Sequence, residues 1–392
     1  MKKLLIFLDE LYFRDGGKYI SNYAAGSFFS DIEGVMKTYL LPVSYNSADK
    51  PESYSVSINS ENNEVVELPE WDSVISYLRK YILSGKVRHY LAQIARKSVS
   101  KNDVIWIRVP SLYGVRLAKE GIRQRKRVIL HFAGDIEMAW KNNKYSGWTR
   151  LPAYLQSKYM HFQLLRLAKL PAVYSLCTGS VLYRTISGLN PNTRFFIDSN
   201  IKRSSLHGHP HDKTKKRFIY IGRLTEDKGI LDLMEIFEKL GQDADKVRFT
   251  IIGFGKEESL IRSIIEQSDH REAYNFIGYV PNSEISTYLR ENDYLVLPSK
   301  VSEGFPRVII EAWAHGLLVL STRVGGIDGL AVHNKNVIFN ELGDLDQLAE
   351  NIRSIIGDRI DTSLMQKNIT GDRDNITYEY YRQIAEEAIN GV

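Results

Sequence analysis

Residues 218–241 read FIYIGRLTEDKGILDLMEIFEKLG, and the pattern of this stretch changes twice. It starts as a short continuous apolar run, which is typical of a β-strand buried on both faces. After a charged loop, apolar side chains recur between Gly229 and Leu240 with the 3.6-residue period of one helix face, and Gly241 supplies a stop. A buried strand, a loop and an amphipathic helix in this order predict one βα unit of a parallel sheet.

Similar apolar runs recur along the chain and alternate with helical stretches. The other predicted strands are residues 4–8, 104–109, 127–131, 249–252, 275–277, 294–297 and 317–320. Because 392 residues exceed the length that one hydrophobic core usually supports, we expect two α/β domains with parallel sheets. We expect an N-terminal domain over 1–200, a polar linker over 201–216, a C-terminal domain over 217–373 and a last segment over 374–392, whose residues 375–389 form an amphipathic helix.

The composition is that of an ordinary globular protein, with 43% hydrophobic and 25% charged residues. A single cysteine, Cys177, excludes a disulfide framework and a four-thiolate zinc site. The apolar run at the N-terminus breaks at Asp9-Glu10, so we interpret it as a first β-strand rather than a signal peptide. No apolar run has the length of a membrane span.

Charge is unevenly distributed along the chain. Residues 1–200 carry a formal charge of +11 and residues 201–392 carry −6. The densest basic segment, residues 116–127, is either a solvated helix end or a contact for an anionic membrane surface or acceptor. No recognition motif accompanies this charge, so nucleic acid is not expected as a partner.

The loop after the strand at 218–221 carries the first candidate site. Gly222 permits a sharp turn, and Gly229 permits close approach at the helix start. Ligands of open α/β sheets bind beyond the carboxyl ends of the strands, and here Arg223 and Lys228 lie together on one loop. Two cations placed in this way suit a diphosphate, although an ordinary solvated surface loop has the same composition.

A second candidate follows the strand at 294–297. The loop contains Glu303, and a helix is expected to begin near Pro306, because proline is a helix-start signal. The N–H groups of that first turn would face an anion. Glu311 lies further along the helix, so the two carboxylates can address different hydroxyls of one extended ligand; a capping Glu and a solvent-facing Glu are the alternatives.

Taken together, these motifs resemble the GT-B superfamily of retaining glycosyltransferases, in particular glycosyltransferase family 4 (glycosyl transferases group 1). The resemblance covers residues 218–339 and includes residues 249–255 (FTIIGFG), 276–280 (FIGYV) and 321–326 (STRVGG). It implies that Arg223 and Lys228 bind the donor diphosphate, with Gly222 in the same loop. It also implies that Glu303 contacts the transferred sugar and Glu311 the nucleotide ribose.

Further roles follow from the same resemblance. Backbone groups of Gly304, Phe305, Pro306, Arg307 and Val308 would meet the sugar and phosphates, and the nucleobase would lie near Tyr279. Arg307 departs from the small polar residue that is common in the family. The resemblance also implies two Rossmann-like α/β domains that face a central cleft, with the last helix crossing back to the N-terminal domain.

The N-terminal half resembles the family only loosely. Gly16-Gly17 follows the first strand, where the family often has a glycine-rich loop that faces the donor phosphates, so Gly17 is a candidate. His131 ends a predicted strand at the place where the family has a histidine beside the reacting carbon, and Asp135 is a second candidate for the acceptor. A structural role for the histidine is the alternative.

The resemblance requires no cofactor and no metal. The Asp-x-Asp pairs at 243/245, 344/346 and 372/374 lie in turn-like stretches, and none follows a buried strand. The alternating His207, His209 and His211 of the linker have no supporting carboxylate or cysteine cluster.

We therefore predict a retaining, metal-independent glycosyltransferase that moves a sugar from a nucleotide-sugar donor to an acceptor hydroxyl. The expected acceptor is a lipid-linked saccharide of bacterial-type cell-envelope polysaccharide synthesis. We expect the protein in the cytoplasm, at the inner face of the cell membrane. The alternatives are a phosphorylase or sugar-nucleotide epimerase of the same fold, or a non-catalytic nucleotide-sugar-binding protein.

Overall fold

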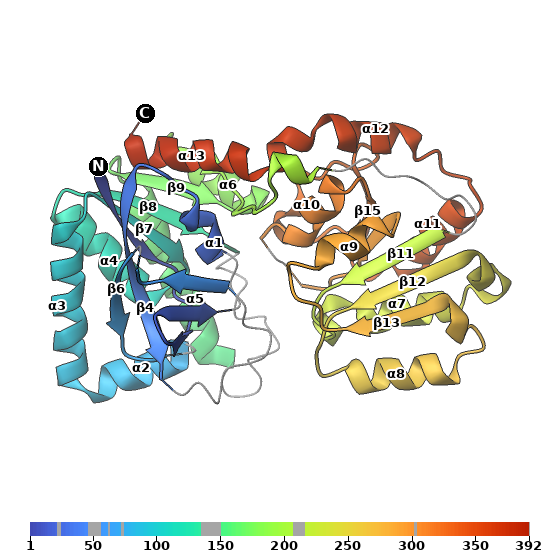
Figure 1. Ribbon diagram of the computed structural model, residues 1–392, viewed down its shortest axis with the longest axis horizontal. Helices are drawn as coiled ribbons and strands as arrows, with labels where there is room; N and C mark the ends of the chain where they lie inside the picture. Colours follow the sequence, from blue (N-terminus) through green and yellow to red (C-terminus); the bar gives the residue numbers. More distant parts are fainter. Residues whose placement is uncertain are drawn as a thin grey trace. The chain divides into compact units, whose positions relative to one another are not determined.

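The structure is a computed structural model that describes residues 1–21, 25–45, 56–61, 63–71, 74–134, 150–206, 216–301 and 304–391. The chain divides into two compact units. Unit 1 comprises Met1–Asn200 and Tyr378–Val392, and unit 2 comprises Ile201–Thr377 (Figure 1). The chain thus changes unit after Asn200 and again after Thr377. Of the expected linker, residues 207–215 lie outside the described residues.

Unit 2 is built around a six-stranded sheet in the order β13-β12-β11-β14-β15-β16, and every pair in it is parallel. The strands are β11 (Lys216–Ile221), β12 (Val247–Ile252), β13 (Tyr274–Gly278), β14 (Tyr294–Leu297), β15 (Leu318–Thr322) and β16 (Val337–Asn340). This is the strand order of a dinucleotide-type fold, whose order reverses between β11 and β14. Ligands of such sheets bind at the carboxyl edge near that reversal.

The helices of unit 2 cover both faces of its sheet. They are α7 (Ile230–Glu238), α8 (Glu258–Gln267), α9 (Ile285–Arg290), α10 (Arg307–Ala314), α11 (Leu345–Ile356) and α12 (Ser363–Gly371). Right-handed crossovers place α7 and α8 on one face and α9 and α10 on the other. The apolar stripe of α7 buries Phe237, whose ring stacks on Phe249 of β12 at a centroid distance of 4.1 Å.

Unit 1 contains a larger sheet in the order β10-β9-β8-β7-β1-β4-β2-β3-β5, and β6 also pairs with β4. The strands from β10 to β4 are parallel, whereas β2, β3 and β5 form an antiparallel ribbon. The strands are β1 (Lys2–Phe7), β2 (Tyr12–Asp15), β3 (Lys18–Ser21), β4 (Val35–Ser44), β5 (Val56–Asn59), β6 (Glu64–Leu68), β7 (Val104–Val109), β8 (Arg127–Phe132), β9 (Val173–Cys177) and β10 (Thr193–Phe195).

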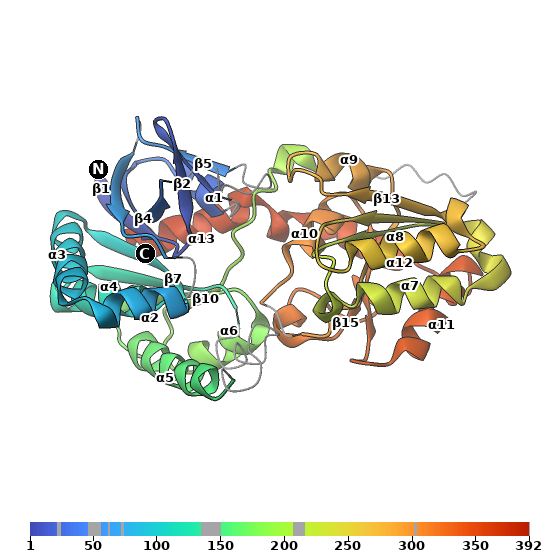
Figure 2. The ribbon, with the colours of Figure 1, turned by 90° about the horizontal axis from the view of Figure 1, so that it is seen from below.

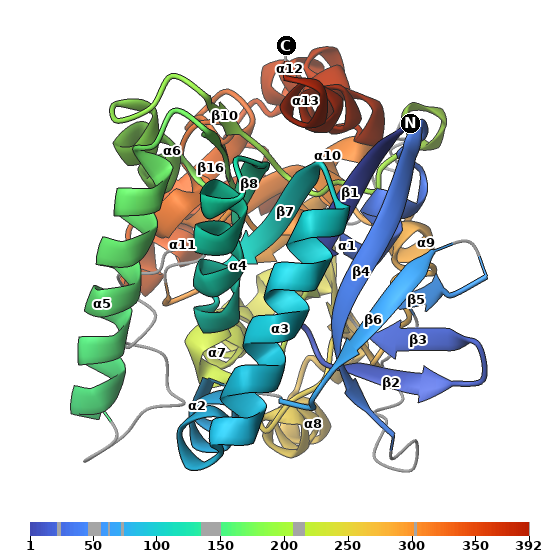
Figure 3. The same ribbon diagram turned by 90° about the vertical axis from the view of Figure 1, so that its left-hand side faces the viewer.

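Helices also cover both faces of this sheet. They are α1 (Ala25–Ser30), α2 (Val74–Leu83), α3 (Gly85–Lys101), α4 (Leu112–Arg123), α5 (Arg150–Ala168), α6 (Ser180–Ser187) and α13 (Tyr378–Asn390). One core packs α3, α4 and α5 against the sheet, and these three helices stand in a row in Figure 3. On the opposite face, Phe28 of α1 contacts Tyr378 of α13 at 5.3 Å between ring centroids, and Lys2 Nζ donates to the carbonyl of Asn390 at 3.0 Å.

All eight predicted strands are present, with bounds shifted by at most a few residues. The antiparallel ribbon of unit 1 was not predicted. In the described part of the chain, no helix is both long enough and apolar enough to cross a membrane.

Candidate functional site

The loop between β11 and α7 lies at the reversal of strand order in unit 2. Its backbone is fixed to the neighbouring strand end: Gly222 N–H donates to the carbonyl of Ile252 at 3.1 Å, and Leu224 N–H donates to that of Phe254 at 2.9 Å. Leu224 is fully buried and anchors the middle of the loop. The loop therefore presents its charged side chains from a rigid backbone.

Gly229 ends this loop, and no other residue fits its position. Its φ of +70° lies in the left-handed region, and an added Cβ would lie 2.0 Å from the carbonyl oxygen of Pro298. Lys300 N–H donates to the carbonyl of Asp227 at 2.9 Å. The loop that follows β14 is thus packed directly on the loop that follows β11, and two candidate segments distant in sequence meet here.

Arg223 and Lys228 both lie on this fixed loop, and Arg223 is exposed while Lys228 is partly buried. Arg223 forms an ion pair with Asp227 at 3.2 Å. Burial acts to raise the pKa of Asp227, but a hydrogen bond with Thr225 and the charges of Arg223 and Lys228 lower it, and the net pKa lies below the ordinary value. Asp227 therefore stays ionised and orients the guanidinium, while the partly exposed ion pair adds little stability.

The second candidate segment leads into α10. Pro306 caps this helix with an extended ψ of 117°, and Arg307 is its first residue. Phe305 is buried, with its ring 6.0 Å from that of Trp313, so the chain entering the helix is held in place. The first turn of α10 begins at Arg307 and directs its N–H groups toward the N-terminal end of the helix. Gly304 precedes this turn, and Glu303 lies outside the described residues.

Glu311 lies one helical turn after Arg307, on the same side of α10. Burial raises the pKa of its carboxyl group, and the charge of Arg307 opposes that rise only in part. A carboxylate in such surroundings is costly unless something binds it. Glu311 is therefore suited to accept hydrogen bonds from a ligand rather than from water.

Two exposed aromatic side chains meet at the ends of β12 and β13. The ring of Tyr279 lies 5.6 Å from the ring of Phe254, edge to face, and Gly253 N–H donates to the carbonyl of Gly278 at 2.8 Å. Tyr279 was predicted to lie near a base, whereas Phe254 was not singled out. The GFG sequence at 253–255 could have indicated Phe254. Its two glycines allow close approach to the backbone of the loop after β11, and Phe254 between them is exposed.

Unit 2 has a cavity of about 390 Å³ at the same sheet edge. It is bounded by the ends of β14, β15 and β16 and by the N-terminal turns of α7 and α11. Lys300, paired with Asp232 at 2.8 Å, and Asn340 both line it. The Nδ2 atom of Asn340 is buried and has no hydrogen-bond partner within the described ranges. Neither residue was predicted, since both depend on strands that meet only in the folded unit.

Gly17 does not lie in the loop directly after the first strand of unit 1, where it was predicted. Gly16 and Gly17 form the turn of the β2–β3 hairpin, and the carbonyl of Gly17 accepts from Ser60 Oγ at 2.7 Å. The loop directly after β1 instead carries Asp9 and Glu10. The glycine pair is therefore a hairpin turn rather than a loop at the end of the first strand, and the DGGK sequence at 15–18 signals such a turn.

Asp9 and Glu10 were not predicted as site residues. Asp9 has a φ of +52°, rare for a non-glycine residue, and accepts a hydrogen bond from Trp71 Nε1 at 2.8 Å. Burial raises the pKa of both carboxyl groups, while the charge of Arg108 lowers both. Strained backbone and shifted carboxylates at the end of a strand are features that concentrate at functional sites.

His131 is fully buried on the face of the unit 1 sheet that α13 covers. Its ring lies edge-on to Phe196 at 5.1 Å, and its Nε2 lies 3.2 Å from the Thr178 hydroxyl. That hydroxyl donates to the carbonyl of Phe196, so Nε2 carries the ring proton. Burial lowers the pKa of His131 to about 4, with Asp198 opposing the shift. This placement favours the structural alternative for His131; Asp135 lies outside the described residues.

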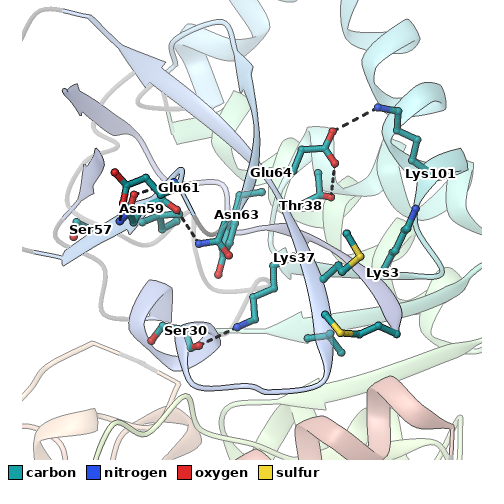
Figure 4. Close-up of a pocket in the computed structure, with 15 residues that line it drawn as sticks. Lys3, Ser30, Lys37, Thr38, Ser57, Asn59, Glu61, Asn63, Glu64 and Lys101 are labelled. Carbon is teal, nitrogen blue, oxygen red and sulfur yellow. Dashed lines mark hydrogen bonds and ion pairs between the residues drawn. The ribbon is translucent and has the colours of Figure 1, made fainter. Parts of the chain in front are cut away.

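A larger pocket of about 750 Å³ lies elsewhere in unit 1 (Figure 4). It is lined by the amino ends of β1 and β4 and by β5, so it lies at the opposite sheet edge from Asp9 and His131. Its lysines are largely engaged: Lys37 Nζ donates to the carbonyl of Ser30 at 2.9 Å, and Lys101 pairs with Glu64 at 3.5 Å. We therefore do not assign it to the candidate site.

No group of three or more His, Cys, Asp or Glu residues within the described ranges is arranged to hold a metal ion. Of the three Asp-x-Asp pairs, Asp344 caps α11 by accepting from Gln347 N–H at 2.8 Å. The histidines at 207, 209 and 211 lie outside the described residues.

Comparison with known proteins identifies the family of unit 2. Residues 202–371 match the family described as Glycosyl transferases group 1. This segment is a glycosyl transferases group 1 domain. The match confirms the predicted resemblance to the glycosyl transferases of group 1. The loop that carries Arg223 and Lys228 and the helix α10 that carries Glu311 both belong to this group 1 domain.

Two curated relatives match part of the chain. The amylovoran biosynthesis glycosyltransferase AmsK of Erwinia amylovora is 35% identical over 138 residues, 34% of this chain and 34% of that protein. The putative colanic acid biosynthesis glycosyltransferase WcaL of Escherichia coli strain K12 is 27% identical over 176 residues, 44% of this chain and 43% of that protein. The matches thus span less than half of either relative's length.

The crystal structure of Anabaena HepE in complex with UDP has a TM-score of 0.67 to this chain at 15% identity, over 100% of both chains. This likeness confirms the predicted fold class, an α/β chain with two parallel-sheet units of the GT-B type.

Proposed function

We propose that this chain is a retaining glycosyltransferase whose group 1 domain binds a nucleotide-sugar donor and whose unit 1 binds the acceptor. The observation that carries the proposal is the fixed loop at the strand-order reversal. Gly229 and its contact with Pro298 join that loop to the segment leading into α10. Two cations and a partly buried carboxylate, Glu311, are thereby held at one sheet edge.

In this proposal each part of the donor has its own group of residues. Arg223 and Lys228 bind the diphosphate, because a guanidinium fork and a point charge together match its oxygens. Glu311 accepts from the ribose hydroxyls, and the exposed Tyr279 and Phe254 flank the base. Glu303 contacts the sugar, and the backbone of Gly304–Val308 contacts sugar and phosphate.

The reaction breaks the bond between the anomeric carbon and the donor phosphate oxygen. An acceptor hydroxyl attacks the same face of the sugar, and its proton passes to the departing phosphate oxygen. Arg223, Lys228 and the first-turn N–H groups of α10 stabilise the charge that develops on the diphosphate. Preorganised cations supply this stabilisation without a metal ion, and we propose none.

The proposed acceptor is a lipid-linked saccharide of a cell-envelope polysaccharide, at the inner face of the cell membrane. Support comes from the charge of +11 on residues 1–200 and from AmsK and WcaL, whose names place those proteins in amylovoran and colanic acid biosynthesis.

A panel of nucleotide sugars tests the proposal. The correct donor should raise the melting temperature of the protein and be slowly hydrolysed, since a ligand that binds the native state stabilises it. Proton NMR of the product should show the anomeric configuration of the donor. An inverted centre would refute retention. Phosphate-dependent sugar release, or interconversion of the free nucleotide sugar, would favour the phosphorylase or epimerase alternative.

A further inference from the structure

The cavity of about 390 Å³ in unit 2 has a place of its own beside the donor site. The first turns of α7 and α11 border it, and these two helices lie side by side (Figure 2). Arg353 of α11 donates to the carbonyl of Lys239, the residue after α7, at 3.3 Å. Pro298, whose carbonyl adjoins Gly229, also lines the cavity. The cavity thus adjoins the fixed loop, whereas Glu311 lies on α10, on the other face of the sheet.

Asn340, the last residue of β16, presents a fixed amide to this cavity. Its side chain is only 2% exposed, and its Oδ1 accepts from Asn351 Nδ2 at 2.7 Å. That bond assigns Nδ2 of Asn340 as a donor, and within the described ranges nothing accepts from it. A buried donor without an acceptor is unfavourable. The amide therefore favours a ligand that brings an oxygen.

An ion pair at the same cavity supplies a donor and an acceptor together. Lys300 Nζ lies 2.8 Å from the Asp232 carboxylate, and both residues line the cavity. The backbone of Lys300 is held as well, because its N–H donates to the carbonyl of Asp227 at 2.9 Å. A hydroxyl group both donates and accepts, so one hydroxyl can meet the two members of this pair.

The turn between β16 and α11 adds an apolar wall. Glu341 N–H donates to Gln347 Oε1 at 2.7 Å, and Gln347 N–H donates to Asp344 Oδ1 at 2.8 Å. These two bonds fix the turn on both sides of Leu342, which lines the cavity and is 57% exposed. The buried Leu348 continues the apolar lining. An exposed leucine is thus held in place beside hydrogen-bonding groups.

The charges of the lining disfavour ionic ligands. Among the described lining residues, the carboxylates Asp232, Glu341 and Asp344 outnumber the one ammonium group, Lys300. A phosphate would meet this excess of negative charge, and a metal cation would meet Lys300 and the amide N–H of Asn340. The lining suits an uncharged ligand that has several hydroxyl groups and an apolar side.

We propose that this cavity binds an uncharged pyranose and is a second sugar site, separate from that of the donor. Ring hydroxyls accept from Asn340 Nδ2 and bridge Lys300 and Asp232, while the C–H groups of the ring pack on Leu342. Apolar walls with a few placed polar groups are the usual construction of a small-molecule site. The inference goes beyond the proposed function, since sugar binding here requires no donor.

Saturation-transfer NMR of the full chain tests the proposal with the methyl glycosides of glucose, galactose, mannose and N-acetylglucosamine. At least one glycoside should bind wild type. Asn340→Asp should bind it at least tenfold more weakly, because a carboxylate keeps the bond from Asn351 but has no N–H to donate. Leu342→Ala, a change at an exposed position, should bind at least threefold more weakly. Leu364→Ala, a 62% exposed leucine on α12, is the matched control and should bind like wild type.

Absent glycoside binding by wild type would overturn the proposal, as would binding that neither Asn340→Asp nor Leu342→Ala weakens. If circular dichroism shows that Asn340→Asp is unfolded, Leu342→Ala decides. Inorganic phosphate or Mg²⁺ that binds wild type but not the variants, while no glycoside binds, would also overturn it. Lys228→Ala should bind the glycoside like wild type. Failure of the nucleotide-sugar panel alone therefore tells against the proposed function, and failure of the glycosides alone tells against the second sugar site.

Discussion

The carboxyl edges of the two sheets use charge in opposite ways. In unit 2, Arg223 is exposed and Lys228 is partly exposed, on a loop whose backbone is fixed by contact with Pro298. In unit 1, His131 is buried and Asp9 is partly buried, and desolvation shifts both pKa values toward the neutral forms. The first arrangement suits a multiply charged ligand that arrives from water. The second keeps charge low near the place proposed for a neutral hydroxyl acceptor.

The difference also separates what is local in sequence from what is not. The charged loop of unit 2 and the glycine that ends it lie within a few residues of each other. The diphosphate-binding motif of the group 1 domain can therefore be predicted from the sequence. The burial of His131 depends on Phe196 and Trp106 from two other segments. Its surroundings could not be derived from the strand end in which it lies.

The largest expected effect is on the stability of unit 2. Gly229→Ala should lower the free energy of unfolding by about 4 kcal/mol, because the new Cβ would collide with the Pro298 carbonyl in addition to the cost of positive φ. Gly241→Ala is the matched control, with φ of +56° and nothing within 4 Å of the added Cβ, and should lose only about 1 kcal/mol. Urea denaturation measures both. Equal losses would show that the close contact of the two loops is not the constraint.

Lys228→Ala addresses the chemistry of the same loop. Turnover should fall about 10²–10³-fold, since a preorganised cation on the leaving diphosphate is removed. Circular dichroism should remain unchanged. Lys246→Ala, which removes a solvated lysine paired with Asp243, should keep full turnover. Near-normal turnover in Lys228→Ala would remove the diphosphate assignment.

His131 tests the buried side of the comparison. Its pKa is lowered from 6.5 to about 4 in the folded state, so the unfolded chain binds the extra proton between these values. Stability should therefore fall as pH drops from 7 to 5, by about 2 kcal/mol from this group. His131→Phe lacks this contribution, so its free energy of unfolding should fall by about 2 kcal/mol less between pH 7 and pH 5 than that of wild type. Urea denaturation of both proteins at the two pH values measures the difference. An unchanged slope would mean that His131 is not buried as a neutral base.

Glu311→Gln should weaken binding of the donor nucleotide without lowering the free energy of unfolding at pH 8. Affinity for the donor nucleotide should fall about tenfold with the loss of a charged acceptor. The carboxyl pKa of Glu311 is raised above its ordinary 4.5 by burial, so wild-type stability declines as pH rises above that value. The variant lacks this decline and should be at least as stable as wild type at pH 8. A variant that binds normally would exclude Glu311 from the ribose site.

The strands of unit 2 were predictable because buried parallel strands are continuous apolar runs bounded by turn residues. β14 matches its predicted range, residues 294–297. The β2–β3–β5 ribbon was missed, because its strands are four residues each and partly polar. Lys300 and Asn340 of the unit 2 cavity were missed for another reason. Lys300 lies in the loop after β14 and Asn340 is the last residue of β16, and only the strand order of the folded sheet brings them together.

Calorimetric titration tests most directly whether the fixed loop of the group 1 domain holds a donor diphosphate. Wild type and Lys228→Ala are titrated with the nucleoside diphosphate and with the free nucleoside of the donor found by the panel. The account predicts at least tenfold weaker binding of the diphosphate to the variant, with nucleoside affinity unchanged. Equal affinities of the two proteins for the diphosphate would contradict it.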